Sequence, residues 1–162
     1  MGKKTFLEAC ISGNTAVVEF CIENEFRFGH GVYDRIIRKF HDPFHLIKLL
    51  QKNGYPWYPS TCKAAVSIDD LQLHRWLRFQ GCPWNEKTCN EAVAMDRYEV
   101  LKYAHKNGCP WSKQTYACCF SEEGLKWAYD EIPTDYQCSE EIIEYLHRHN
   151  CPQPNPDDWI IE

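Results

Sequence analysis

The sequence predicts an all-α fold, a solenoid of antiparallel helix pairs with a ~27-residue period. First, Gly-Cys-Pro-Trp occurs at Gly81–Trp84 and at Gly108–Trp111, and Gly54–Trp57 lies upstream at the same interval. A fixed period of this length is typical of repeat proteins. Second, the apolar residues between these motifs follow helical spacing. Third, a glycine followed by a proline ends each apolar stretch, as expected where a helix stops.

Composition and charge limit the classes of protein to consider. The 162 residues are 44% hydrophobic and 25% charged, which is typical of one globular domain. A net charge of −5 disfavours a nucleic-acid partner, since phosphates require a basic surface. The chain has no run of 18 apolar residues and no apolar core of a secretory signal near Met1. We therefore expect an intracellular, cytoplasmic protein that binds neither nucleic acid nor membrane.

We divide the chain, as one domain, into copies at residues 5–30, 31–57, 58–84, 85–111 and 112–132, a degenerate copy at 133–152 and a tail at 153–162. In the first copy, apolar residues at 6–10 and 17–21 predict two helices, and Asn24-Glu25 ends the second. In the next copy, residues 36–40 and 46–50 predict two helices, and Gly54 is the stop.

The two central copies have the most regular pattern. Thr61 and Thr88 follow polar loops and are expected to cap the first helices through their hydroxyls. Apolar residues then fall at i, i+3 and i+4, on one helical face. Gly81 and Gly108 are expected to end the second helices, because glycine favours the left-handed conformation that closes a helix.

The C-terminal copies depart from this pattern. Thr115 begins a normal first helix, but residues 125–128 come early, so the turn before them is shortened. Residues 132–135 replace most of the last first helix, and Ser139 is expected to cap the helix that remains. Residues 159–161 are expected to fold back over that helix.

One position of the second helix is apolar in every copy. We expect these side chains to stack as a buried spine through the solenoid. They are Phe20, Leu49, Trp76, Tyr103, Trp127 and Tyr145.

The helix pairs, with Thr at the start and Asn-Gly at the end, resemble ankyrin repeats from about Phe6 to Pro152. The Cys-Pro-Trp loops are similar to a shortened variety that is abundant in large DNA viruses of protists. The ~27-residue period is shorter than the roughly 33-residue ankyrin repeat, and Thr-Pro-Leu-His is missing after Thr61, Thr88 and Thr115. The resemblance implies an ankyrin-like solenoid with short loops in place of β-hairpin fingers. It also implies a monomeric adaptor without catalysis or cofactor, acting on host proteins in the host cytoplasm if the chain is viral.

Two sets of residues follow from the repeat. The repeated residues are expected to serve the structure, with the tryptophans packing loop on loop and each covering the next repeat. They are Gly54, Pro56, Trp57, Gly81, Pro83, Trp84, Gly108, Pro110, Trp111, Thr61, Thr88 and Thr115. The residues that vary beside them are expected to bind a protein partner of unknown identity. They are Tyr58, Ser60, Lys63, Asn85, Glu86, Lys87, Asn90, Ser112, Lys113, Gln114 and Ala117.

Ten cysteines are many for an intracellular chain. Those that recur with the period, Cys62 with Cys89 and Cys82 with Cys109, are replaced by tyrosine in other copies. This exchange favours packing over metal binding or disulfide formation. No Cys-x-x-Cys spacing occurs.

Other functions remain open as alternatives. A metal- or redox-responsive protein could use cysteines and histidines near the C-terminus, namely Cys118, Cys119, Cys138, His147 and His149. A Cys109–His105 catalytic pair lacks an orienting third group. A self-associating structural or virion component is the third alternative. Acidic residues gather late in the chain and basic ones early, a gradient that either orients a charged partner or reflects only a solvated helical face.

Overall fold

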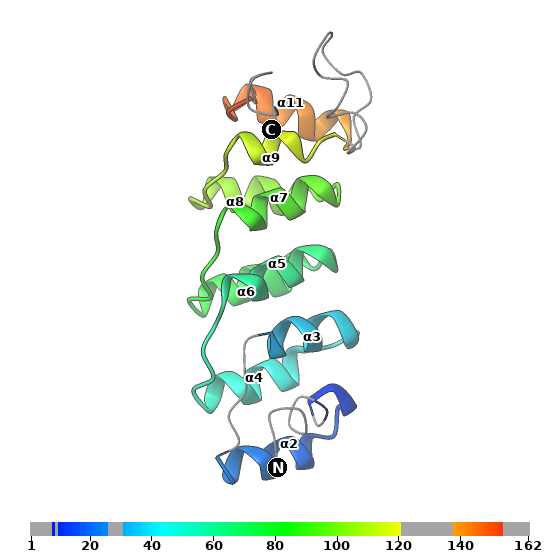
Figure 1. The fold of residues 1–162 in the computed structure, drawn as a ribbon, viewed down its shortest axis with the longest axis vertical. Coiled ribbons are helices and arrows are strands. Elements are labelled where there is room, and N and C mark those ends of the chain that lie inside the picture. The colour runs from blue at the N-terminus through cyan, green and yellow to red at the C-terminus, as the bar shows by residue number, and fades with distance from the viewer. Residues whose placement is uncertain (1–7, 9, 26–30, 121–137, 154–162) are drawn as a thin grey trace, which may run out of the picture. The chain divides into compact units, whose positions relative to one another are not determined.

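The computed structural model describes residues 8, 10–25, 31–120 and 138–153, and the regular secondary structure of these residues is helical without any β-strand. The all-α prediction is therefore confirmed for the described part of the chain. The chain forms two compact units, residues 1–83 (unit 1) and residues 84–162 (unit 2). Figure 1 shows the helices of each unit.

Five helices of unit 1 have bounds within the described residues, and each is eight or nine residues long. They are α2 (Thr15–Glu23), α3 (Val32–Lys39), α4 (Phe44–Lys52), α5 (Pro59–Ser67) and α6 (Leu71–Phe79). Helix α3 packs against α4 and α5, and α5 packs against α6. The side chains that are buried between them include Ile36, Ile37, Ile47, Leu50, Leu73 and Leu77. Such short helices depend on this packing, because isolated helices below about 12 residues are marginal in water.

Unit 2 contains four described helices. They are α7 (Glu86–Ala94), α8 (Tyr98–Lys106), α9 (Lys113–Ala117) and α11 (Glu140–Arg148). Helix α7 packs against α8 and α9, and α8 contacts α11. The predicted helix at residues 125–128, the altered segment at 132–135 and the fold-back at 159–161 lie outside the described residues.

The predicted glycine stops are confirmed. Gly54, Gly81 and Gly108 have φ of 76°, 80° and 81°, in the left-handed region. After α6, the Gly81 N–H donates to the Arg78 carbonyl at 3.0 Å, and the Cys82 N–H donates to the Leu77 carbonyl at 2.9 Å. This pair of bonds is the Schellman motif, which satisfies carbonyls at the end of the helix.

The prediction that threonines cap the first helices is wrong. The residues at the N-cap positions of α5, α7 and α9 are Tyr58, Asn85 and Ser112, three residues before the threonines. The Asn85 side chain accepts from the Lys87 N–H at 3.1 Å, and the Ser112 hydroxyl accepts from the Gln114 N–H at 3.2 Å. The threonines are the third helical residues and are fully buried. The error arose because the loop residues Asn85 and Ser112 and the threonines all have side chains that can cap a helix. The sequence pattern alone does not say which of them does so.

The prediction that one column of the second helices forms a buried spine is also wrong. Phe20 is 57% exposed, and Leu49, Trp76 and Tyr103 are half-buried, whereas Tyr145 is buried. Trp127 lies outside the described residues. In α6 the buried stripe consists of Leu73, His74 and Leu77, and Trp76 lies at its edge. The same column of residues therefore borders the surface along most of its length.

Ser139 does take the N-cap position of α11, although its side chain makes no cap bond. Its backbone N–H donates instead to Asp96 Oδ1 at 2.7 Å.

Candidate functional site

The predicted partner-binding residues differ widely in exposure. Glu86, Lys87, Lys113 and Gln114 are exposed in unit 2. The half-buried ones are Tyr58, Ser60 and Lys63 in unit 1, and Asn85, Asn90 and Ser112 in unit 2.

Some of these residues are used inside the fold. Asn90 Oδ1 accepts from the Thr115 hydroxyl at 2.6 Å, and Asn85 and Ser112 are helix caps. Ala117 is only 1% exposed and lies on α9, which packs against α7. Its assignment to the partner-binding surface is therefore wrong, since a short side chain on an outer helix copy can still face the neighbouring helix.

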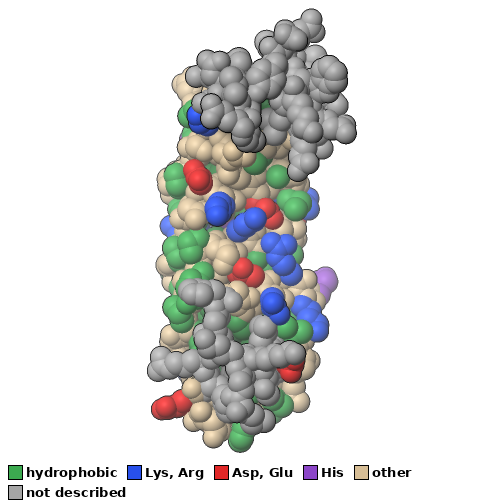
Figure 2. All heavy atoms as spheres, viewed as in Figure 1, with side chains coloured by type: hydrophobic (Ala, Val, Ile, Leu, Met, Phe, Trp, Pro, Cys, Tyr) green, Lys and Arg blue, Asp and Glu red, His purple; other side chains and the backbone are tan. Residues whose placement is uncertain are grey.

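Unit 1 has a basic face on its first helices. Arg35, Arg38 and Lys39 are exposed on α3, and Lys63 is half-buried on α5, which packs against α3. The single acidic residue in these two helices is Asp34, which is half-buried. Figure 2 shows Lys and Arg side chains gathered over this region. We call Arg35, Arg38, Lys39 and Lys63 the basic face.

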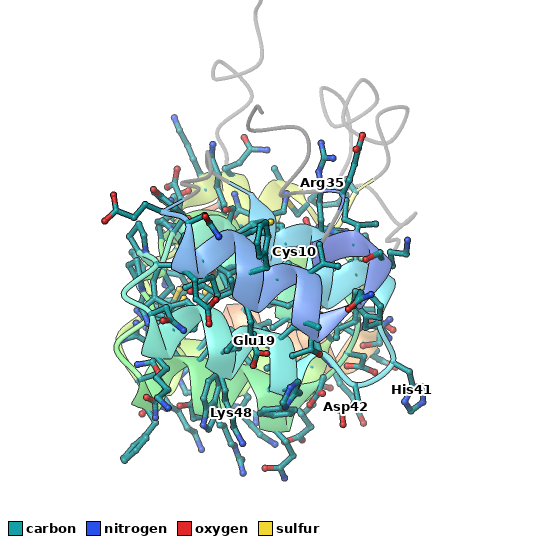
Figure 3. All side chains as sticks on the ribbon, turned by 90° about the horizontal axis from the view of Figure 1, so that it is seen from below. Cys10, Glu19, Arg35, His41, Asp42 and Lys48 are labelled. Atoms are coloured by element: carbon teal, nitrogen blue, oxygen red, sulfur yellow. The ribbon has the colours of Figure 1, made fainter. Side chains whose placement is uncertain are left out.

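The opposite side of unit 1 combines cations with aromatic rings. Figure 3 shows Lys48 of α4 pointing away from the side that Arg35 occupies. The Lys48 ammonium lies 5.4 Å from the Phe44 ring and 5.8 Å from the Trp76 ring. The Phe44 and Trp76 rings are 5.5 Å apart in an edge arrangement. Phe79 of α6 is 86% exposed, and neither α4 nor α6 contains an acidic residue.

The sequence analysis missed this second surface because it assigned Trp76 to the core. The signal was present in the sequence: Lys48 and Arg75 lie one repeat period apart, each next to a member of the apolar column. A charged neighbour at the adjacent position places the column at a boundary rather than at the centre of the buried face.

The loop tryptophans pack against rings of helices. Trp57 lies 4.5 Å from Tyr33 and 6.3 Å from Trp76 between ring centroids. Trp84 contacts Tyr103 at 6.3 Å. Trp57 and Trp84 therefore pack against other rings, but these rings belong to helices and not to other loops, as the loop-on-loop prediction required.

An aromatic and histidine cluster occupies unit 2. Trp111 stacks on His105 with ring centroids 3.6 Å apart, and His105 Nδ1 lies 3.2 Å from the Tyr145 hydroxyl. The His149 ring is 5.3 Å from His105 and 4.3 Å from Tyr145. Burial, together with the neighbouring His149, lowers the pKa of His105. Rings that stack and hydrogen-bond with one another in this way favour a structural role.

The cysteines and histidines of the metal alternative have different partners. The Cys119 thiol is hydrogen-bonded to Cys138, whereas His147 Nε2 lies 2.7 Å from the Tyr116 hydroxyl. Within the described ranges, no group of three or more His, Cys, Asp or Glu side chains is arranged to hold a metal ion. The Cys109 thiol lies 3.3 Å from the Asn85 carbonyl oxygen, and the His105 ring stacks on Trp111.

The loop cysteines share one contact. Each thiol points at the carbonyl of the N-cap residue of a first helix: Cys82 at Tyr58 (3.7 Å), Cys109 at Asn85 (3.3 Å) and Cys151 at Ser112 (3.6 Å). A thiol is a weak donor. This recurring contact supports packing as the role of these positions. The structure nevertheless brings Cys62 and Cys82 together, which the exchange with tyrosine had argued against.

Among the residues that the structure describes, no helix has the length and apolar character needed to cross a membrane. Comparisons with protein-family models, with curated proteins and with solved structures found no match.

Proposed function

We propose that this chain is a non-catalytic protein–protein interaction module, a solenoid of ankyrin-like helix pairs joined by short loops. Helices that begin at Pro59, Glu86 and Lys113 support the repeat period read from the sequence. The repeated glycine stops and thiol–carbonyl contacts support it as well. In such scaffolds the repeated residues hold copies together and the variable surface binds.

The basic face of unit 1 is the observation that carries the proposal. Its exposed cations lie on α3, and the half-buried variable residues Ser60 and Lys63 lie on α5, which packs against α3. Charge complementarity raises association rates and orients the partner. We therefore propose that the partner presents an acidic segment to α3 and α5.

Unit 2 contributes a second set of contacts in this proposal. Glu86, Lys87, Lys113 and Gln114 are exposed beside the N-terminal ends of α7 and α9. Their mixed charges would select among acidic partners rather than add attraction.

Charge reversal on one face tests the proposal. The double variant Arg35→Glu with Lys39→Glu should abolish capture of the partner in a quantitative affinity purification. The matched control is Lys48→Glu with Lys52→Glu, which makes the same charge change on the opposite side of unit 1 and should leave capture intact. Glu86→Lys with Lys113→Glu should weaken it.

The α3 and α4 double variants together decide which face of unit 1 binds the partner. If the α4 double abolishes binding and the α3 double does not, the cation–aromatic surface around Trp76 is the binding face. If neither changes capture at low salt, where surface electrostatics are strongest, the assigned mode of binding is wrong.

A further inference from the structure

Two buried thiols meet in unit 1. Cys62 is the fourth residue of α5, and Cys82 lies in the loop after α6. Both side chains have no exposed surface, and the two Sγ atoms are 3.3 Å apart. Both residues are reduced thiols in the structure.

The surroundings hold the Cys82 side chain toward α5. Its N–H closes the Schellman motif at Leu77, and its Sγ lies 3.7 Å from the Tyr58 carbonyl oxygen. A disulfide requires sulfur atoms about 2.05 Å apart, so they must approach by roughly 1.3 Å. Gly81 precedes Cys82 with φ of 80°, and its surroundings are open within 4 Å of a Cβ position. Gly81 itself is therefore not crowded by neighbouring residues.

The same arrangement recurs one period later. Cys89 of α7 and Cys109 of the following loop are hydrogen-bonded through their thiols, and this bond and burial raise the pKa of Cys89. In the third such place the first helix carries Tyr116 instead, and the loop thiol of Cys151 contacts the Ser112 carbonyl. Among the described residues, two thiol pairs thus join a first helix to the loop after the second helix, and Tyr116 replaces the helix thiol in an otherwise similar arrangement.

We propose that Cys62 and Cys82 form a redox-modification site, a dithiol that peroxide converts to an intramolecular disulfide. One thiol loses its proton to solvent when the loop opens, and the thiolate attacks a peroxide oxygen. The O–O bond breaks, an S–O bond forms, and the released hydroxide takes up a proton to become water. The second thiol then attacks the sulfenic sulfur, the S–O bond breaks, and a second water leaves. Two thiols and one hydrogen peroxide thereby give one disulfide and two waters.

The disulfide would tie the start of α5 to the loop that follows α6. Because it closes a chain segment of 20 residues, it restricts the unfolded chain and stabilises unit 1. Cys89 and Cys109 would form the corresponding bond in unit 2.

The experiment treats the full-length chain with hydrogen peroxide under native conditions. Remaining thiols are then blocked with N-ethylmaleimide, and non-reducing peptide mapping follows. We expect a linked peptide that joins Cys62 to Cys82, and a rise in Tm of roughly 5 °C that dithiothreitol reverses. The Cys151→Ala variant removes the loop thiol that has a tyrosine in place of the helix thiol, and it should keep both the link and the rise.

Two single variants separate the disulfide from packing effects. In Cys82→Ala and in Cys62→Ala the linked peptide must disappear, and the peroxide-dependent rise in Tm must shrink relative to Cys151→Ala. If one variant fails to fold, the other decides. Sulfinic or sulfonic acid at Cys62 and Cys82 without any linked peptide would overturn the proposal, as would a rise of unchanged size in either variant.

Discussion

At the scale of single residues, three threonines in the same helical position differ in the hydrogen bonds of their hydroxyls. Thr61, Thr88 and Thr115 are the third residues of their helices and are completely buried. Thr115 Oγ1 accepts from the Ser112 N–H at 3.1 Å and donates to Asn90. Among the described residues, the hydroxyls of Thr61 and Thr88 have no hydrogen-bond partner.

This difference predicts opposite results for one substitution. Thr88→Val keeps the side-chain shape and removes a buried unpartnered hydroxyl, so stability should be unchanged or rise by about 1 kcal/mol. Thr115→Val breaks two bonds and should cost about 1–3 kcal/mol. Urea denaturation of both variants measures the two changes. An equal loss of stability in Thr88→Val and Thr115→Val would mean that the Thr88 hydroxyl makes a hydrogen bond like a helix cap.

The glycine stops give a second residue-scale prediction. Gly81 has φ of 80° and open surroundings, so a substitution there is strained only by its backbone. Gly81→Ala should cost about 1–2 kcal/mol. Gly81→Asn should cost less, because asparagine tolerates this region and Asn150 adopts φ of 53° at the end of α11. Thermal unfolding of Gly81→Ala and Gly81→Asn ranks their stabilities. A Gly81→Asn variant that is less stable than Gly81→Ala would contradict this prediction.

At the scale of elements, helix ends are fixed by a few local bonds and helix faces by packing. The nine-residue helices of this chain need both, because their intrinsic stability is small. Asn85 shows how one cap residue is used twice, since its side chain accepts from Lys87 and its carbonyl receives the Cys109 thiol.

Cap substitutions at Asn85 should separate the side-chain bond from the loop contact. Asn85→Ala should destabilise the protein by about 1 kcal/mol, because the Lys87 N–H loses its acceptor. Asn85→Asp keeps an acceptor and places negative charge at the N-terminus of α7, so its stability should be close to that of the unmodified protein. Equilibrium unfolding at neutral pH distinguishes them. A similar loss in both variants would show that the amide group itself is needed.

The same scale explains where the sequence-based prediction failed. Helical spacing correctly placed Cys89, Ala92 and Val93 in the core, and the glycine stops were correct. Periodicity also marked the column through Trp76 as apolar, but it does not tell a buried stripe from its border. A large ring tolerates partial exposure, so only the contacts with Phe44, Trp57 and Lys48 decide its place.

At the scale of the whole molecule, the two units carry opposite charge. Residues 1–83 contain 11 Lys and Arg against 8 Asp and Glu, whereas residues 84–162 contain 7 against 15. The basic face of unit 1 is therefore part of a wider imbalance. It accords with an acidic partner that engages unit 1.

Acid should destabilise unit 1 through His74. This side chain is fully buried in α6, and burial, with a smaller contribution from Arg78, lowers its pKa to about 4. The unfolded chain binds the proton near the ordinary pKa of 6.5, so it gains protons first as the pH falls. The contribution of neutral His74 to the free energy of unfolding is fully present above about pH 6.5. Roughly 3 kcal/mol of this free energy is lost by about pH 4.

The control for this prediction removes the imidazole. Denaturant unfolding of the native protein and of His74→Gln between pH 7.5 and pH 4 should give a shallower pH dependence for the variant. Hydrogen exchange should show loss of protection in peptides from α5 and α6. Parallel pH curves for the two proteins would mean that the pKa of His74 is the same in the folded and the unfolded chain.

By itself the sequence determined the all-helical class, the core positions of the central helices and the places where they stop. These follow from local rules, since the 3.6-residue spacing and the left-handed glycine act within one helix. The tertiary structure decided what the sequence could not, because burial and thiol distances depend on which neighbouring helix or loop lies opposite. It brought Cys62 to Cys82, buried Ala117, and left Arg35 and Lys39 exposed beside α5.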